Sequence, residues 1–150
     1  MIDTLLILLI LFLPLGSFLY QIFFASKNCH KIPILAMSAC MLISLFLFFN
    51  FFGDYQFNSS LKWLSINAFE IDLGIWLNDA TIIMIFVVSL ISFLVHVYSI
   101  SYMKGDLRYS RYFAYLGLFT FSMNGVVISD NLFMIFIFWE LVGLSSYLLI

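Results

Sequence analysis

A single carboxylate inside a long apolar run is the side chain of this sequence best placed to do chemistry. Glu140 is the one charged residue between positions 131 and 150, and it stands near the middle of that run. If the run is a helix that crosses a membrane, an ionised Glu140 costs several kcal/mol unless other helices or water surround it. Such residues mark proton and ion pathways. The sequence therefore predicts proton transfer by Glu140, and the alternative is a neutral glutamate that only hydrogen-bonds a neighbouring helix.

A stripe of polar side chains is the second pattern that could carry protons. Its members are spaced by three, four and three residues, so they share one face of a helix. They are Ser89, Ser92, His96 and Ser99. The stripe could order a chain of water molecules that passes protons, or it could hydrogen-bond to other helices, which is what serine most often does in membranes. Both interpretations stay open for His96, and packing is favoured for the serines.

Acidic residues stand at the starts of two apolar runs. Asp79 precedes the run at 80–103, and Asp130 precedes the run at 131–150. An acid at a helix N-terminus interacts favourably with the helix dipole, so capping is the default role of both residues. Asp79 is kept beside His96 as a secondary candidate for a proton path.

Several kinds of binding site have no support in the sequence. Cys29 and Cys40 belong to no CxxC pair and to no Cys/His cluster with metal spacing, so both are expected to be buried small side chains. There is no phosphate-binding glycine loop and no nucleophile elbow. The net charge of −2 gives no basic surface for nucleic acid. We expect this chain to bind no metal, no redox cofactor and no nucleic acid.

The elements that position these residues follow from composition. The chain is 65% hydrophobic and 9% charged, whereas soluble domains carry about 25% charged residues. Five apolar runs come near the roughly 20 residues that a membrane-spanning helix needs. In lipid the backbone must satisfy its own hydrogen bonds, which requires helices. The sequence predicts an all-α, multi-pass integral membrane protein with helices at residues 4–26, 32–53, 80–103, 112–129 and 131–150.

The segments between the runs differ in charge and in period. Five of the six Lys and Arg residues lie in 27–31 and 104–111, and the positive-inside rule places those two segments on the inner side. Residues 69–78 alternate between apolar and polar side chains, which is the period of a strand. The sequence predicts a short β-hairpin at residues 61–77 on the outer side. The acidic N-terminus lacks the basic region of a signal peptide, so the first run is expected to be a retained helix.

Four sequence motifs resemble one family of membrane proteins. They are HVYSISYM at residues 96–103, YSRYFAY at 109–115, DNL at 130–132 and WELVGLSSYLLI at 139–150. In this order they resemble the N-terminal part of the largest antiporter-like membrane subunit of respiratory complex I, called chain 5 or subunit L. Leu77, Asn78 and Asp79 also fit that family. The likeness is strong over residues 77–150 and weaker before them.

The resemblance implies a proton-translocating membrane subunit of NADH:quinone oxidoreductase. Residues 1–150 would be the N-terminal part of a single antiporter-like transmembrane domain, an incomplete helical bundle truncated at its C-terminus and without catalytic activity alone. NADH, FMN, iron–sulfur clusters and quinone would bind other subunits, and the partners would be other membrane subunits of complex I. In this family the membrane glutamate of the WE motif, here Glu140, pairs with a lysine on a later, broken helix that this sequence lacks. No role is implied for His96 or Asp79.

Two other functions stay open. A subunit of a multi-subunit sodium/proton antiporter would share much of the same pattern. A structural membrane protein could use Glu140 only to hold helices together. For a complex I subunit, we favour a bacterial plasma membrane over a mitochondrial inner membrane.

Overall fold

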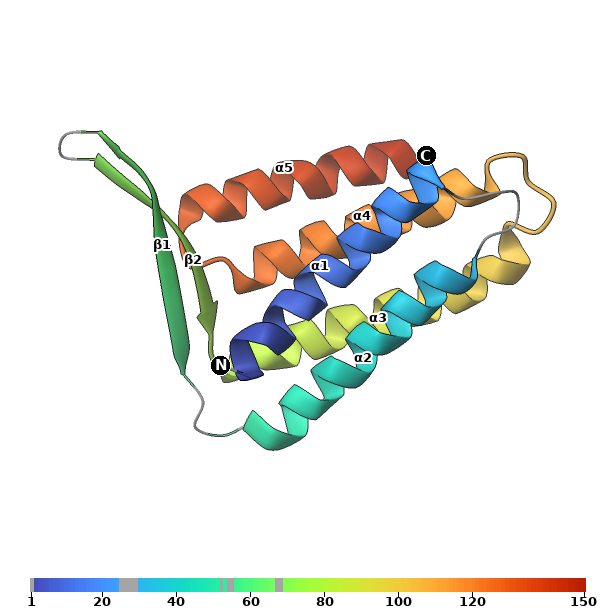
Figure 1. Cartoon of the computed structure of the whole chain (residues 1–150). Helices are drawn as coiled ribbons and strands as arrows, with labels where there is room; N and C mark the ends of the chain where they lie inside the picture. The colour runs from blue at the N-terminus through green and yellow to red at the C-terminus, as the bar shows by residue number, and fades with distance from the viewer. Residues whose placement is uncertain (1, 25–29, 52, 54–55, 67–68) are drawn as a thin grey trace.

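In the part of the chain that it describes, the computed structural model has five helices and one two-stranded sheet (Figure 1). The described residues are 2–24, 30–51, 53, 56–66 and 69–150, so Cys29 lies outside them. The elements in chain order are α1 (Ile2–Phe23), α2 (Lys31–Phe51), β1 (Phe57–Ile66), β2 (Phe69–Leu77), α3 (Asp79–Tyr102), α4 (Tyr109–Ile128) and α5 (Leu132–Leu149). The five predicted helices are confirmed, with bounds that differ by a few residues.

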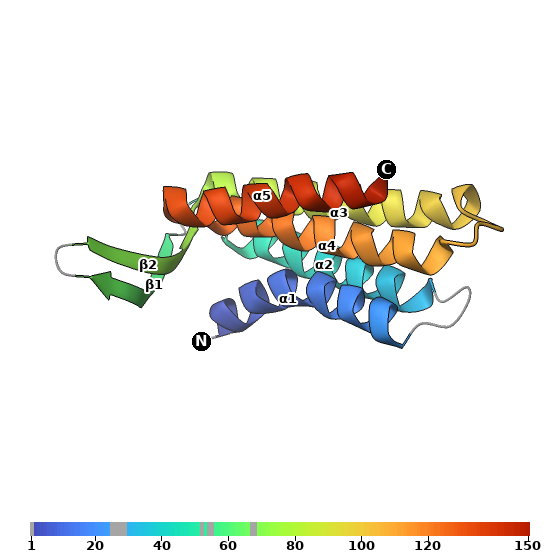
Figure 2. The same cartoon turned by 90° about the horizontal axis from the view of Figure 1, so that it is seen from above.

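The helices run up and down in one bundle, and Figure 2 shows the hairpin projecting from one end of it. α4 lies in the middle and packs against α1, α3 and α5, while α2 packs against α1 and α3. Asn78 and Asn131 are the N-cap residues directly before α3 and α5, and their side-chain oxygens accept backbone N–H groups at 2.8 and 2.9 Å. Side-chain capping therefore belongs to the neighbouring asparagines, whose short side chains reach these N–H groups equally well. Asp79 lies in the first turn of α3, where its charge meets the helix dipole as predicted, whereas Asp130 lies before the cap of α5.

The central position of α4 explains why it is the least apolar helix. Among the described residues, α1, α2, α3 and α5 are each long and apolar enough to cross a membrane. α4 instead buries three polar side chains, Thr120, Ser122 and Asn124, and two glycines, Gly117 and Gly125. Small and polar residues permit close helix packing and hydrogen bonding within a membrane. The lower hydropathy of α4 thus reflects its contacts with other helices.

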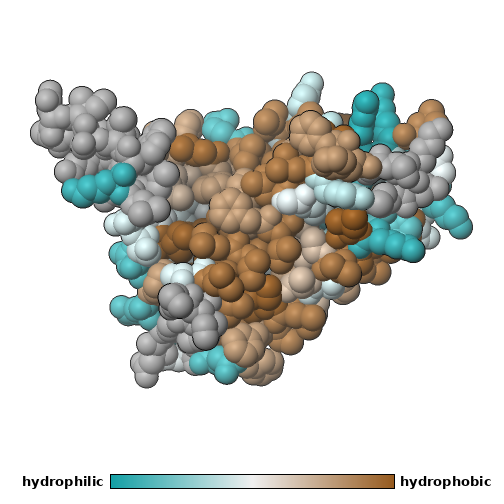
Figure 3. Space-filling model, in the orientation of Figure 1, coloured by the Kyte–Doolittle hydropathy of each residue, from teal (hydrophilic) through white to brown (hydrophobic). Residues whose placement is uncertain are grey.

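Large apolar side chains cover the outer surface of the bundle. Figure 3 shows a hydrophobic region over the helices, with hydrophilic residues gathered towards the two ends. Phe12, Leu42, Phe46 and Ile91 are each more than half exposed. Soluble monomers rarely expose contiguous apolar patches larger than a few hundred Å², so this surface suits contact with lipid. The chain is an integral, multi-pass membrane protein.

The predicted hairpin is confirmed, although its first strand is longer than expected. β1 and β2 pair antiparallel with Phe57 opposite Leu77, and the register shifts between Lys62 and Leu64. β1 begins four residues before the predicted start of the hairpin at position 61. The alternating pattern predicts the bounds of β2 well. β1 begins earlier than predicted because its first residues pair with the end of β2.

Gly74 attaches the hairpin to the bundle. Its carbonyl accepts the backbone N–H of Asp130 at 3.4 Å, and its own N–H points at the sulfur of Met134 at 3.2 Å. A Cβ at position 74 would overlap the Asp130 carboxylate. Only glycine allows the strand to come this close to the connection between α4 and α5.

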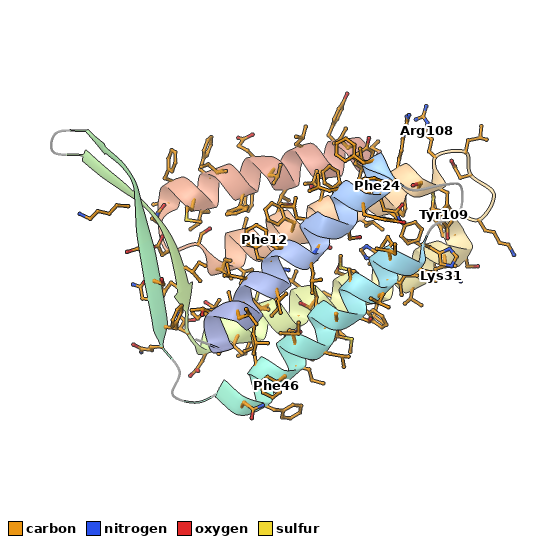
Figure 4. The ribbon with its side chains drawn as sticks, in the orientation of Figure 1. Phe12, Phe24, Lys31, Phe46, Arg108 and Tyr109 are labelled. Carbon is orange, nitrogen blue, oxygen red and sulfur yellow. The ribbon has the colours of Figure 1, made fainter. Side chains whose placement is uncertain are left out.

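Basic residues at the start of α2 and before α4 lie at the end of the bundle away from the hairpin, whereas Lys62 lies in β1. Figure 4 shows Lys31 and Arg108 there, beside Tyr109. Lys31 begins α2, and Arg108 precedes α4. The structure therefore places Lys31 and Arg108, one from each of the two segments that the sequence predicts to be internal, at the same end.

Cysteine labelling measures which side of the membrane this end faces. In a Cys29→Ser background the remaining Cys40 is fully buried, so labelling is expected only at the introduced cysteine. We expect Asn58→Cys, at an exposed position of β1, to react from outside with an impermeant reagent. Leu107→Cys, in the fully exposed α3–α4 connection, should react only after the membrane is opened. Equal reaction of both cysteines from outside would contradict the topology.

Candidate functional site

Glu140 lies in the middle of α5. It is the ninth of the 18 residues of that helix, about 12 Å along the axis from Leu132. Its side chain is exposed, and among the described residues it makes no hydrogen bond or ion pair. Phe136, Trp139 and Gly143 beside it are exposed as well. The described helices therefore leave the Glu140 face of α5 uncovered, and Gly143 shares this face.

α5 touches the bundle through its opposite side. Phe138 packs edge-on against Phe121 of α4, with ring centroids 5.6 Å apart. The Phe138 ring also lies against Gly125, where a Cβ would overlap it. In α5 as described, Ser145 is the one buried residue. A helix of 3.6 residues per turn places Phe138 and Ser145 on one side and Glu140 on the other, so this packing turns Glu140 away from α4.

His96 of α3 is fully buried beside Phe113 of α4, with ring centroids 6.0 Å apart. Its Nδ1 lies 2.8 Å from the Ser92 carbonyl oxygen and 3.5 Å from the Ser92 hydroxyl. A carbonyl can only accept, so Nδ1 carries the proton in the neutral ring. Nε2 is then the acceptor, and it is buried without a partner among the described residues.

Serines of the same stripe reach side chains of α4. The hydroxyl oxygens of Ser92 and Thr120 are 2.5 Å apart, and Thr120 donates to the Leu116 carbonyl at 3.0 Å. Because Thr120 gives its proton to that carbonyl, Ser92 is the donor in the pair. Further along α3, the hydroxyl oxygens of Ser99 and Tyr112 are 3.4 Å apart. Contact between helices, one of the two predicted roles of the stripe, is present at both serines.

A cavity of about 150 Å³ lies between α3 and α4 beside the Ser92–Thr120 pair. Apart from these two residues its walls are apolar, formed by Val88, Ile91, Val95, Leu116, Phe119 and Met123. Cavities with apolar walls stay dry or take apolar guests. The hydroxyl pair, and not the cavity, is the polar feature of this interface.

Asp79 lies in the first turn of α3, at the hairpin end of the bundle. Its Oδ1 accepts the backbone N–H of Gly53 at 3.2 Å and so ties the region after α2 to α3. From position 79 to position 96 the helix rises about 25 Å. α4 separates α3 from α5, which do not touch among the described residues. The structure therefore does not bring Asp79, His96 and Glu140 together in one site.

Asn124 is a fully buried side chain that sequence reasoning missed. Pro14 lies inside α1 and lacks the N–H that would pair with the Ile10 carbonyl one turn before it. The Asn124 amide donates to this carbonyl at 3.4 Å, and the Cys40 thiol lies 3.8 Å from it. The one signal in the sequence is Pro14 itself, because a proline in a membrane helix frees an acceptor that a neighbouring helix must satisfy. Burial of Cys40, as predicted, is part of this arrangement.

Asn124→Leu is expected to destabilise the contact between α1 and α4, because the Ile10 carbonyl loses its side-chain donor. The cost should be about 1–3 kcal/mol, visible as a lower melting temperature of the purified protein in detergent. Asn50→Leu is the matched control, since Asn50 is an exposed helical residue that donates to the Phe46 carbonyl at 2.8 Å. Equal destabilisation by the two substitutions would contradict the role assigned to Asn124.

The described residues offer no candidate metal centre. Within them, no three His, Cys, Asp or Glu side chains gather closely enough to hold an ion. Glu140 and the His96 stripe stay the candidates for proton exchange.

Comparison with known proteins places the chain in a family. Residues 63–113 match the family model described as NADH-ubiquinone oxidoreductase (complex I), chain 5 N-terminus. The chloroplastic NAD(P)H-quinone oxidoreductase subunit 5 of Cryptomeria japonica is 39% identical over 150 residues, which is 93% of this chain and 20% of the relative. NADH-ubiquinone oxidoreductase chain 5 of Chondrus crispus is 38% identical over 149 residues, 95% of this chain and 22% of the relative. The chain spans about a fifth of the length of these relatives.

Solved structures share the arrangement of the helices and the hairpin. A chain of the Mrp complex from a Dietzia species superposes with a TM-score of 0.75 at 20% identity, over 99% of this chain and 16% of that one. A chain of the membrane-bound sulfane sulfur reductase, an archaeal respiratory membrane complex, superposes with a TM-score of 0.74 at 16% identity. The superposition covers 97% of this chain and 29% of that one. At these identities the likeness concerns the fold. The sequence matches go further, and by them this chain belongs to the family of chain 5 membrane subunits of NADH–quinone oxidoreductase.

Proposed function

We propose that the protein containing this chain is a proton-translocating membrane subunit of an NADH–quinone oxidoreductase, in which Glu140 takes up and releases protons. The observation that carries the proposal is a carboxylate in the middle of α5, on a face that the described helices leave uncovered. A membrane helix holds such a residue only when a partner or water offsets its cost. The family resemblance supplies a partner, a lysine on a later helix.

The surroundings of Glu140 suit a pair of charges shielded from water. Phe136 and Trp139 are 60% and 66% exposed on the same side of α5, so a covering helix would enclose the carboxylate in apolar side chains. Charges interact more strongly in such an environment than in water. A glutamate whose proton affinity responds to the position of a lysine can bind and release a proton as that distance changes.

Other subunits are proposed to carry out the electron transfer. NADH, FMN, iron–sulfur clusters and quinone would bind there, and further membrane subunits of the same complex would be the partners of this chain. Asp79 stays a secondary candidate for the proton path, and its bond to Gly53 supports an anchoring role at the outer end. One relative is named as chloroplastic, and the other name states no compartment. These names give no support to a bacterial plasma membrane over a mitochondrial inner membrane.

The test uses the full-length protein in its assembled complex, in sealed inside-out vesicles. NADH oxidation should drive proton uptake to the same extent with and without sodium, and an uncoupler should abolish it. Exchange of sodium for protons without NADH or quinone would instead identify an antiporter subunit, the second candidate function. An assembled complex that shows neither activity would contradict both functions and leave a structural role.

A further inference from the structure

Two buried polar atoms on α3 have no partner among the described residues. They are Nε2 of His96 and Oγ of Ser89. Both residues are almost completely shielded, and they lie on one face of the helix about 10 Å apart. Unpaired polar atoms are costly where lipid surrounds the protein. In native structures, ordered water commonly satisfies buried atoms of this kind.

We propose that internal water molecules bind Nε2 of His96 and Oγ of Ser89 and join the hydroxyl groups between α3 and α4 into a proton relay centred on His96. The proposal rests on the proton-translocating function above. It adds a second proton-carrying element inside the bundle, which α4 separates from Glu140 on α5.

Three pairs of polar groups lie along this interface. Ser99 lies 3.4 Å from the Tyr112 hydroxyl, His96 Nδ1 lies 3.5 Å from the Ser92 hydroxyl, and Ser92 lies 2.5 Å from Thr120. Every member can both donate and accept a proton. The two longer separations exceed good hydrogen-bond geometry, and a bridging water or a small shift of a side chain would close them.

The geometry around His96 allows a balanced transfer. A hydronium ion at the first water gives its proton to Nε2 and becomes water. The imidazolium then releases its Nδ1 proton to the Ser92 hydroxyl, which turns its own proton from Thr120 to the water held by Ser89, one helical turn away. Only N–H and O–H bonds break and form, and one proton moves along α3. The ring is left as the other neutral tautomer, with its proton on Nε2, and rotation of the ring, not a reverse transfer, brings that proton back to the Ser92 side before the next cycle.

A map of the unmodified, assembled complex that shows ordered water tests the two sites directly. We expect density for a water molecule within hydrogen-bond distance of His96 Nε2 and another at Ser89 Oγ. A side chain from another part of the complex bonded to Nε2 would overturn the proposal, as would the absence of density at both atoms. This measurement does not depend on the folding of any variant.

The relay is tested by proton uptake per NADH oxidised. His96→Gln keeps a donor and an acceptor but cannot carry a proton through a ring, so uptake should fall by about 100-fold. Ser89→Ala should lower uptake as well, because its water loses a ligand. Ser145→Ala is the matched control, since Ser145 is a buried serine whose one hydrogen bond within the described residues goes to the Val142 carbonyl of its own helix, at 2.9 Å.

Two outcomes separate this proposal from the proposed function. Normal proton uptake by an assembled His96→Gln complex would overturn the relay. Unchanged uptake by Ser89→Ala together with a higher melting temperature would overturn it as well, because only the removal of a dry, unpaired hydroxyl is stabilising or neutral. Neither outcome affects the proposed function while the unmodified complex pumps protons. Proton translocation by the complex, whatever the role of Glu140, fails if NADH oxidation drives no proton uptake in the unmodified complex.

Discussion

Glu140→Gln is expected to lower NADH-driven proton uptake about 100-fold, which is the scale on which a positioned acid or base contributes to a proton-transfer reaction, while the complex still assembles. Glutamine keeps almost the size of glutamate and can hydrogen-bond, but it cannot ionise. A glutamate that was only structural and already neutral would tolerate the amide. Proton uptake in vesicles is the measurement, and the amount of assembled complex is determined separately on native gels.

Two further variants make the Glu140 experiment specific. Glu140→Asp keeps the acid and shortens the side chain by one methylene, so partial uptake should remain. Ser146→Ala changes another exposed residue of α5, whose hydroxyl bonds to the Gly143 carbonyl at 2.9 Å, and it should be without effect. NADH oxidation should fall together with uptake because the two are coupled. Normal uptake by fully assembled Glu140→Gln would remove Glu140 from the mechanism, and loss of assembly would support a structural role.

Most of the fold could be predicted because lipid restricts what an apolar chain can form. An uncharged run of about 20 residues has to be a helix there, since no water is present to pair with an irregular backbone. This requirement gave five helices whose ends differ from the observed ones by a few residues. The hairpin was visible because its second strand, at 69–77, alternates with period two. Its first strand begins at Phe57, where Asn58 and the two following serines show no alternation, so pattern alone placed it too late.

Features that depend on contacts between helices could not be predicted in the same way. Hydropathy does not distinguish a helix in the middle of a bundle from a weakly apolar helix, so the central position of α4 became clear only from its packing. Asn124 shows no pattern of its own, because its role depends on the carbonyl that Pro14 frees in another helix. The chemistry of Glu140 could be expected from its position in the sequence. The direction in which the Glu140 side chain points depends on the contact between Phe138 and Gly125, which the sequence does not reveal.

Gly125→Leu is expected to impair assembly more than any other glycine substitution in the helices. A Cβ at position 125 would overlap the ring of Phe138, and the edge-on contact with Phe121 restricts how far that ring can turn. A leucine would push α5 away from α4, and overpacking of this kind costs about 1–3 kcal/mol. We expect less assembled complex in membranes and a lower melting temperature in detergent. Gly125→Ala should show a smaller loss in the same direction.

A size exchange between the two helices gives this prediction its control. Gly125→Ala combined with Phe138→Leu removes the ring that the new methyl group meets, so assembly should recover at least in part. Gly16→Ala is the matched control in α1, because a Cβ there has nothing within 4 Å. Since Phe138 and Glu140 lie on opposite sides of α5, a displaced helix would also change where Glu140 sits, and proton uptake per assembled complex should fall with Gly125→Leu. If Gly125→Leu assembled and pumped as well as Gly16→Ala, the contact between Gly125 and Phe138 would not be what holds α5, and the direction assigned to Glu140 would lose its main support.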